Sequence, residues 1–265
     1  MAEFGTAVPT GGDAPEPRQS APRQRSAAAE FGWGLVSTAV LALWIAWQWG
    51  WIWALAGVFG ILVHETGHML VINALGCGPS RIHIIPFLGG AATMKRAPRT
   101  EFQGVLIALA GPVAGLAASL PFFIAASVTH DARWAGGAFF IAMLNLLNLL
   151  PAPPLDGSKA LGPALAWVHP WLERMALVVV GAAAVLWALG RGSLLFGAFV
   201  AIATLAALRG RGQRPPAERM SAGEWLGAIG LWLGALALGL LVLDLSVGGG
   251  GARGVMAAIR HAGLQ

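Results

Sequence analysis

The stretch "GVFGILVHETGHMLVINALG", Gly57 to Gly76, is apolar enough to lie in a lipid bilayer, yet it holds two histidines and a glutamate within five residues. A membrane-spanning helix needs about 20 predominantly apolar residues, and this stretch has that length. Ionisable side chains inside a membrane are costly and are found mainly where they serve a function. The stretch therefore predicts a membrane helix that carries a functional site.

The composition of the whole chain indicates that this helix is one of several. Of the 265 residues, 57% are hydrophobic and 11% are charged, and the mean hydropathy is +0.69, outside the range of ordinary soluble domains. Because the apolar runs lack the alternation of barrel strands, we expect an all-α polytopic membrane protein with about six to seven transmembrane helices. The expected spans are 31–48, 52–75, 102–128, 134–150, 172–189, 193–208 and 222–245. The sixth of these is short.

The polar segments predict the domain organisation and the orientation. Residues 1–30 are rich in Pro, Gly, Ala and Arg and are expected to form a disordered cytoplasmic tail, followed by a membrane-embedded domain at 31–265. If this tail is cytoplasmic, 13 of the 17 Lys and Arg residues fall on the inner side, as the positive-inside rule requires. These topology signals explain the net charge of +5, so the lipid bilayer is the expected partner and nucleic acid is not.

The opening stretch contains the pattern H-E-x-x-H, formed by His64, Glu65 and His68. Residues four apart lie on one face of a helix, so both histidines can direct a ring nitrogen to one metal ion. Zinc suits this pair, and Glu65 beside it is placed to take a proton from an activated water. A chance match would bury three polar side chains without use.

A catalytic zinc site usually has three protein ligands, so a third is needed. The single cysteine, Cys77, excludes a Cys-rich site. The best candidate is Asp156, which follows the fourth expected span in "NLLNLLPAPPLDGSKA", on the same membrane side as His68. In the same segment Asn148 is suited either to donate its amide to a substrate carbonyl or developing oxyanion, or to cap the helix before Pro151.

The loop "GCGPSRIHIIPFLGGAATMKRAPRT" between the second and third expected spans differs from the helices. "RIHII" and "AATMK" have strand character and "FLGG" can turn, so a small cytoplasmic-side β-hairpin is expected. Two isolated strands are marginal, and this pair therefore has to pack on the helices.

Together these motifs resemble the site-2 protease family of intramembrane zinc metalloproteases, peptidase family M50. The matching elements are HETGH at 64–68, "AGPVAG" at 110–115, and N-x-x-P-x-x-x-L-D-G at 148–157, in the family's order. The joint match covers about 52–160, which makes this the expected catalytic core, and leaves additional spans at about 172–245. One departure is Gly115, where many relatives carry Asn; we expect this position to serve helix packing.

The resemblance implies a role for each matched residue. His64, His68 and Asp156 would hold one Zn2+ per chain, Glu65 would be the general base, and Asn148 would position substrate or stabilise the oxyanion. The hairpin would pair with an unwound substrate segment through the residues Pro86, Phe87, Gly89 and Gly90, although a plain connecting hairpin is the alternative. No PDZ-like or other appended soluble domain is expected.

The expected function is therefore that of an intramembrane zinc metalloendopeptidase, multi-pass in a bacterial inner membrane with a cytoplasmic N-terminus. The resemblance implies a membrane-anchored protein as substrate: an anti-sigma factor, an anchored transcription regulator or a remnant signal peptide. Two alternatives remain open from the sequence. One is a zinc transporter or sensor that uses the same ligands, and the other is a zinc-binding membrane protein without proteolytic activity.

Overall fold

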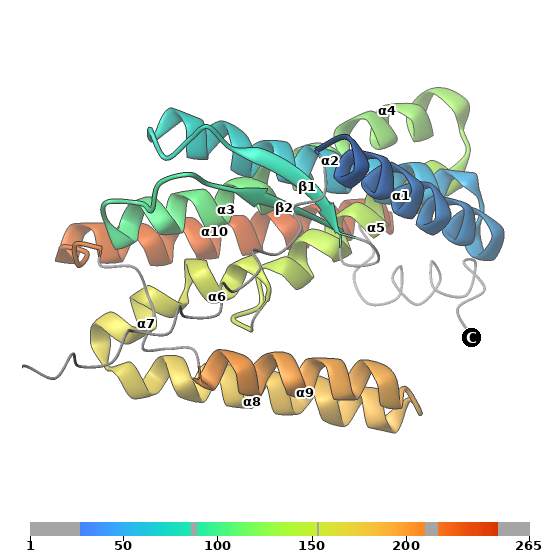
Figure 1. Ribbon diagram of the computed structural model, residues 1–265. Helices are drawn as coiled ribbons and strands as arrows, with labels where there is room; N and C mark the ends of the chain where they lie inside the picture. Colours follow the sequence, from blue (N-terminus) through green and yellow to red (C-terminus); the bar gives the residue numbers. More distant parts are fainter. Residues whose placement is uncertain (1–26, 86–88, 153, 210–216, 249–265) are drawn as a thin grey trace, which may run out of the picture.

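The computed structural model describes residues 27–85, 89–152, 154–209 and 217–248. Their elements are shown in Figure 1 and are, in chain order, α1 (Ala27–Trp49), α2 (Trp51–Ala74), β1 (Arg81–Ile85), β2 (Gly89–Thr93), α3 (Glu101–Ala117), α4 (Leu120–Thr129), α5 (Ala132–Asn148), α6 (Asp156–Ala160), α7 (Gly162–Val168), α8 (Pro170–Gly190), α9 (Leu194–Arg209) and α10 (Ala222–Ser246). The chain is thus mostly helical, as expected. Most of the expected tail lies outside the described residues, but α1 begins at Ala27, inside the range assigned to it.

Four helical segments in the described part of the chain are long and apolar enough to cross a membrane: Trp51–Ala74, Glu101–Thr129, Pro170–Gly190 and Ala222–Ser246. Shorter apolar helices lie at Leu35–Trp49 and Val200–Arg209. The fourth expected span corresponds to α5, which has 17 residues and ends before Pro151. A helical membrane protein is therefore supported, whereas the count of six to seven spans is not confirmed.

The third expected span is divided between α3 and α4. Thr100 caps the start of α3 by accepting a hydrogen bond from the Gln103 N–H at 3.1 Å. The chain turns at Ser119, whose hydroxyl donates to the Leu116 carbonyl at 2.6 Å, and Pro121 stands in the first turn of α4. Proline lacks a backbone N–H and is tolerated in a first helical turn, where that group has no helical partner.

The core of the molecule is the packing of α2, α3 and α5. At Gly67 of α2, a Cβ atom would overlap the Ala110 carbonyl of α3 and lie 2.6 Å from the Ala114 Cβ, so α2 and α3 approach closely at this glycine. Near the start of α2, Ile52 and Ala56 pack with Ile141 of α5 in one buried cluster. Close packing through small residues is the usual way in which membrane helices associate.

Helix α10 covers the opposite side of α3 and α5, although it lies far along the chain. A capping box closes its first turn, because Ser221 and Glu224 each bond the backbone N–H of the other. Buried side chains of α10 join residues of α3 in one apolar cluster, including Val105 and Ala235. The last long helix is therefore part of the same bundle as the motif-bearing segment.

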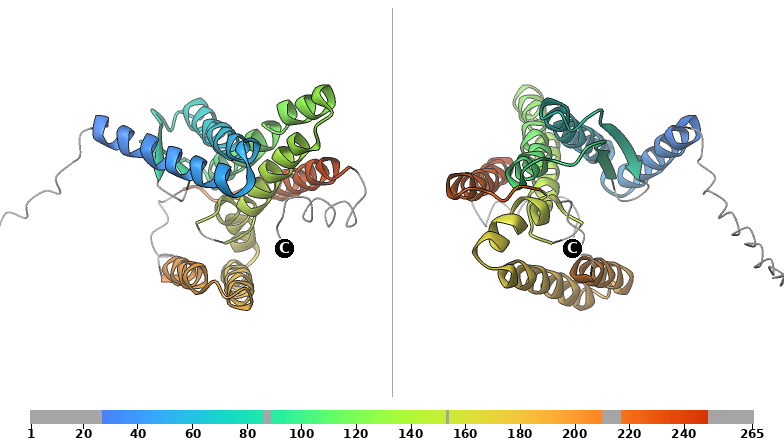
Figure 2. Two further views of the ribbon diagram at one scale, coloured as in Figure 1. Left: turned by 90° about the vertical axis from the view of Figure 1, so that its right-hand side faces the viewer. Right: turned by 60° about the vertical axis from the view of Figure 1, so that its left-hand side comes forward.

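Helices α8 and α9 form a pair of their own. Both views in Figure 2 show this pair lying apart from the other long helices. At Gly181 a Cβ atom would lie 2.6 Å from the Thr204 hydroxyl, so the two helices are in close contact. Only 17% of the membrane-length window of α8 is buried inside the molecule, which leaves most of α8 free to face lipid.

A two-stranded antiparallel sheet lies between α2 and α3, where a hairpin was predicted. Arg81 pairs with Thr93 and Ile85 pairs with Gly89. The second strand begins at Gly89, so the two glycines that were expected in the turn are in the strand. Of the predicted substrate-binding residues, Pro86 and Phe87 lie outside the described residues. The cytoplasmic placement of the sheet remains a prediction.

The starts of α3 and α10 lie side by side. Thr100 and Glu218 form an isolated parallel bridge, and the Glu101 carboxylate accepts a hydrogen bond from the Met220 N–H at 3.3 Å. The Trp167 indole of α7 donates to the Met220 carbonyl at 2.9 Å. These contacts bring together segments that the predicted topology places on one membrane side.

Candidate metal centre

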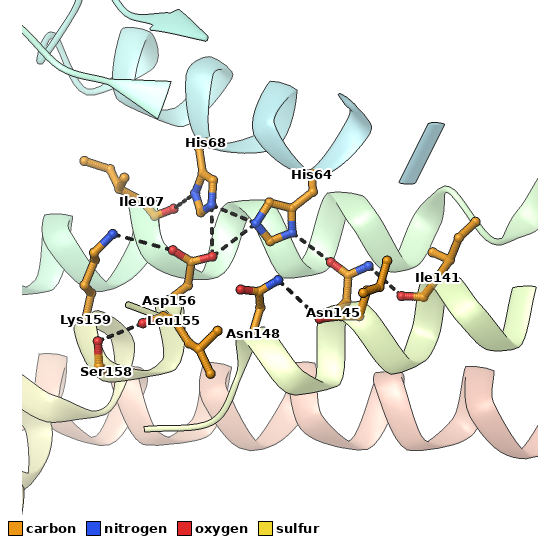
Figure 3. Close-up of polar contacts among 11 residues, drawn as sticks. His64, His68, Ile107, Ile141, Asn145, Asn148, Leu155, Asp156, Ser158 and Lys159 are labelled. Atoms are coloured by element: carbon orange, nitrogen blue, oxygen red, sulfur yellow. Dashed lines mark hydrogen bonds and ion pairs between the residues drawn. The ribbon is translucent and has the colours of Figure 1, made fainter. Parts of the chain in front are cut away.

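The HETGH motif lies in the middle of α2, as its spacing predicted. His64, Glu65 and His68 are buried, with exposed fractions of 7%, 6% and 7%. The two imidazole rings point away from α2 toward α6 and α5, as Figure 3 shows. The helix therefore presents both histidines on one face to the interior of the bundle.

Asp156 completes a group of three potential metal ligands. It is the first residue of α6, and its Oδ2 atom lies 3.1 Å from His64 Nε2 and 3.2 Å from His68 Nε2. The two Nε2 atoms are themselves 3.1 Å apart. Among the described residues, His64, His68 and Asp156 form the one cluster of histidine, cysteine and acidic side chains that could hold a metal ion.

The hydrogen-bond partners of the histidines determine which ring nitrogens face this point. His68 Nδ1 lies 2.7 Å from the Ile107 carbonyl, which can only accept, so Nδ1 carries the proton. His64 Nδ1 lies 2.8 Å from Asn145 Oδ1. In the neutral imidazoles both Nε2 atoms therefore bear lone pairs, and these face Asp156 Oδ2, which is also an acceptor.

This donor set fits zinc. Two imidazoles and a carboxylate are ordinary zinc ligands, and tetrahedral bonds of about 2.0–2.1 Å place neighbouring ligand atoms roughly 3.3 Å apart. The observed separations of 3.1–3.2 Å are close to this value. A cation removes the repulsion between the three acceptors, so the residues suit one metal ion.

Gly111 lets the backbone of α3 pack directly against the two histidine rings. A Cβ atom at this position would lie 2.5 Å from His68 Cε1 and 2.7 Å from His64 Nε2. Any larger residue would have to displace a histidine ring. The "AGP" part of the predicted motif thus has a steric role in the metal centre.

The segment that carries Asp156 packs on the end of α5, which the middle of α10 also contacts. Gly157 packs so closely on Leu149 that a Cβ atom would overlap the Leu149 carbonyl. The Trp232 indole of α10 donates to the same carbonyl at 3.0 Å. Lys159 Nζ lies 3.7 Å from Asp156 Oδ1, the oxygen that does not face the histidines. The sequence alone had not indicated this role of α10.

Glu65 has a free oxygen beside the centre. Its Oε2 atom is buried and has no hydrogen-bond partner, and it is the one side-chain oxygen or nitrogen atom of this kind among the described residues. Such atoms are rare because burying an unpaired acceptor is costly. The backbone of Ala92 in β2 lies beside the same carboxylate. A water molecule or a substrate group is a suitable partner for Oε2.

The two asparagines of α5 differ in their contacts. Asn148, the predicted oxyanion residue, donates its amide to the Leu144 carbonyl of its own helix at 3.2 Å, and no described contact links it to the histidines. Asn145 was not predicted, yet it is buried and bonded to His64. A second amide one turn before Asn148 in an apolar helix was the available signal. The catalytic and ligand roles themselves remain predictions.

The molecule is helical and largely apolar, and the two histidines of its HExxH motif meet a carboxylate that is distant in the sequence. These features are typical of membrane metalloproteins. The family model described as peptidase family M50 matches residues 52–132. The chain is 32% identical over 130 residues to a putative zinc metalloprotease of Synechocystis, covering 46% of this chain and 33% of the relative. It is 30% identical over 120 residues to a zinc metalloprotease of Methanocaldococcus jannaschii (43% and 34%), and 27% identical over 103 residues to stage IV sporulation protein FB of Bacillus subtilis (38% and 36%).

The chain thus resembles peptidase family M50 over residues 52–132. It spans about a third of the length of the curated relatives it matches. No solved structure matches it. The family match ends at residue 132, so Asp156 is placed at the centre by the geometry of the fold and not by this match.

Proposed function

We propose that the protein is a zinc metalloendopeptidase of the site-2 type, which hydrolyses a peptide bond within or near the transmembrane segment of another protein. The observation that supports this most directly is the meeting of two imidazoles and a carboxylate beside the unpartnered Glu65 oxygen. This arrangement supplies metal ligands and a base at one point. The match of residues 52–132 to the model of peptidase family M50 supports it.

The residues divide the chemistry between them. His64, His68 and Asp156 would hold zinc, which when bound supplies a Lewis acid that activates water and polarises a carbonyl. Glu65 takes the proton of the attacking water and returns it to the leaving amine. Asn148 has a second amide hydrogen beyond the one given to Leu144, and this hydrogen is available to a substrate carbonyl or to the developing oxyanion.

The strand pair gives an extended substrate a place beside the base. The Ala92 backbone of β2 adjoins the Glu65 carboxylate, so a peptide added to this small sheet would run past the centre. Helical peptide carbonyls are hydrogen-bonded, and a transmembrane substrate has to unwind before attack. Strand addition would replace the backbone hydrogen bonds that unwinding removes.

A transport function is less well supported by the same observations. A path for an ion needs polar groups spaced across the membrane. Among the described residues, the buried histidine and acidic side chains are His64, Glu65, His68 and Asp156. All four lie at one point, which suits hydrolysis at a fixed site.

The location and the substrates follow from the predicted topology and the family resemblance. We infer a multi-pass protein of a bacterial inner membrane with its N-terminus in the cytoplasm. Its substrates would be membrane-anchored proteins such as transcription regulators, anti-sigma factors or remnant signal peptides.

Proteoliposomes that contain the purified chain and a membrane-anchored reporter test this function. The zinc-loaded protein should cut the reporter within or next to its transmembrane segment, as mapped by mass spectrometry, and a chelator should stop the reaction. A zinc-sensitive dye inside the same vesicles should report no flux. Zinc flux without cleavage of any anchored reporter would instead support the transporter.

A further inference from the structure

We propose that Asn145 is a positioning residue that fixes the proton and the orientation of His64, in a space that Gly115 leaves open for it. The proposal rests on the proposed function in one respect, because it takes His64 as a metal ligand. It concerns a residue outside the HExxH, AGP and LDG motifs, on a different helix from the histidine that it holds.

The orientation of the Asn145 side chain follows from its two contacts. Its Nδ2 atom lies 2.8 Å from the Ile141 carbonyl. That carbonyl can only accept a hydrogen bond, so the amide nitrogen faces it and Oδ1 faces His64. Figure 3 shows the resulting chain from the Ile141 carbonyl through the carboxamide to the imidazole.

The orientation of Asn145 determines the tautomer of His64. Oδ1 can only accept, and it lies 2.8 Å from His64 Nδ1, so the His64 proton is on Nδ1. The lone pair is then on Nε2, the atom that faces Asp156 and His68. Metal-binding histidines commonly give their second N–H to such an acceptor, which orients the ring and raises its basicity.

Asn145 is buried in the interior and is hydrogen-bonded there. Its exposed fraction is 2%, and both ends of its carboxamide are paired. His68 obtains the equivalent support from a backbone carbonyl, that of Ile107. His64 depends on a side chain, which makes its support open to mutation.

Gly115 of α3 is the complement of Asn145. A Cβ atom at Gly115 would lie 2.6 Å from Asn145 Nδ2 and 2.7 Å from its Cγ. The carboxamide therefore occupies the volume that a side chain at 115 would fill, and the two positions cannot both be large. Gly115 was expected to serve helix packing. Its small size also leaves room for the Asn145 carboxamide that holds His64.

The test uses the full-length protein loaded with Co2+, because the d-electrons of cobalt give a visible spectrum whereas zinc is silent. The variants are Asn145→Leu, which keeps the volume but has no acceptor, and Asn145→Asp, which keeps an acceptor. Ser119→Ala is the matched control, since Ser119 is also buried and bonded to a backbone carbonyl but is not a neighbour of the centre.

Asn145→Leu should weaken metal affinity by about 10- to 100-fold, the usual effect of removing such a partner, and should therefore speed metal loss to a chelator and change the cobalt spectrum. Asn145→Asp should recover most of the wild-type behaviour, and Ser119→Ala should match the wild type. Asn145→Leu with wild-type spectrum and release rate would overturn the proposal. An Asn145→Asp protein as defective as Asn145→Leu would also overturn it.

If Asn145→Leu does not fold, the pair of positions still tests the proposal. Gly115→Ala should displace the carboxamide and speed metal loss, whereas Gly115→Asn combined with Asn145→Ala should slow it again by supplying an amide from α3. No recovery in the folded double variant would contradict the proposal. Metal effects as predicted in a protein that cleaves no substrate would defeat the proteolytic function and leave the role of Asn145 intact.

Discussion

His64 Nε2 lies 3.1 Å from Asp156 Oδ2, although 92 positions separate the two residues. The distance depends on two separate pieces of structure: the middle of α2, and the segment after α5 where the chain cannot remain helical. The candidate metal centre is therefore a product of the tertiary fold, and we expect residues that are not ligands to affect it.

Replacing Asp156 by alanine would remove one of the three proposed ligands, and we expect zinc affinity to fall by more than about 100-fold, beyond the usual effect of losing a residue that only supports a ligand. Competition with a fluorescent chelator measures this directly. Asp131→Ala is the matched control, because Asp131 caps the start of α5 and its side chain pairs with Arg133 at 2.6 Å and not with the histidines. Equal zinc affinity of the two variants would remove Asp156 from the centre.

Gly111→Ala should prevent metal binding without preventing the formation of α3. Alanine is a better helix former than glycine, but its Cβ would meet both histidine rings. Gly104→Ala on the same helix is the control, since the nearest atom to its added Cβ is Pro98 Cγ at 3.8 Å. Zinc stoichiometry after gel filtration distinguishes them, and a Gly111→Ala protein with full zinc content would show that the steric argument is wrong.

Trp232→Phe should destabilise the protein by about 1 kcal/mol, the usual net value of one hydrogen bond. It should also speed zinc release, because the Leu149 carbonyl that loses the indole N–H lies at the base of the segment carrying Asp156. Thermal unfolding in detergent and chelator-driven zinc release provide the two measurements. Trp47→Phe, at a side chain that is 82% exposed, should change neither; if both variants behave alike, α10 does not support the centre.

The sequence predicted the local features of this molecule well and the long-range ones less well. The H-E-x-x-H spacing places His64 and His68 on one helix face because helical geometry is local. Asn145 was missed because its role depends on how α5 turns relative to α2, and Trp232 because its partner is 83 residues away. The helix break after Asn148 was foreseeable from Pro151, whereas the division between α3 and α4 at Ser119 was missed, although Pro121 was an available signal.

The substrate side of the proposal predicts a dependence on helix stability. Each glycine introduced near the scissile bond of a transmembrane reporter weakens its helix by about 0.5–1 kcal/mol, which corresponds to about a two- to five-fold gain in cleavage if unwinding limits the rate. Initial rates with a series of reporters measure this. Rates that do not change, or fall, with added glycine would argue against attack on an unwound segment.

The central claim is that Glu65 acts as the base beside a zinc ion held by other residues. The most direct measurement compares Glu65→Gln with the wild type for zinc content and for cleavage of an anchored reporter in the same proteoliposomes. We expect one zinc per chain in both proteins and cleavage by the wild type alone. Cleavage by Glu65→Gln at a rate near that of the wild type would contradict the claim.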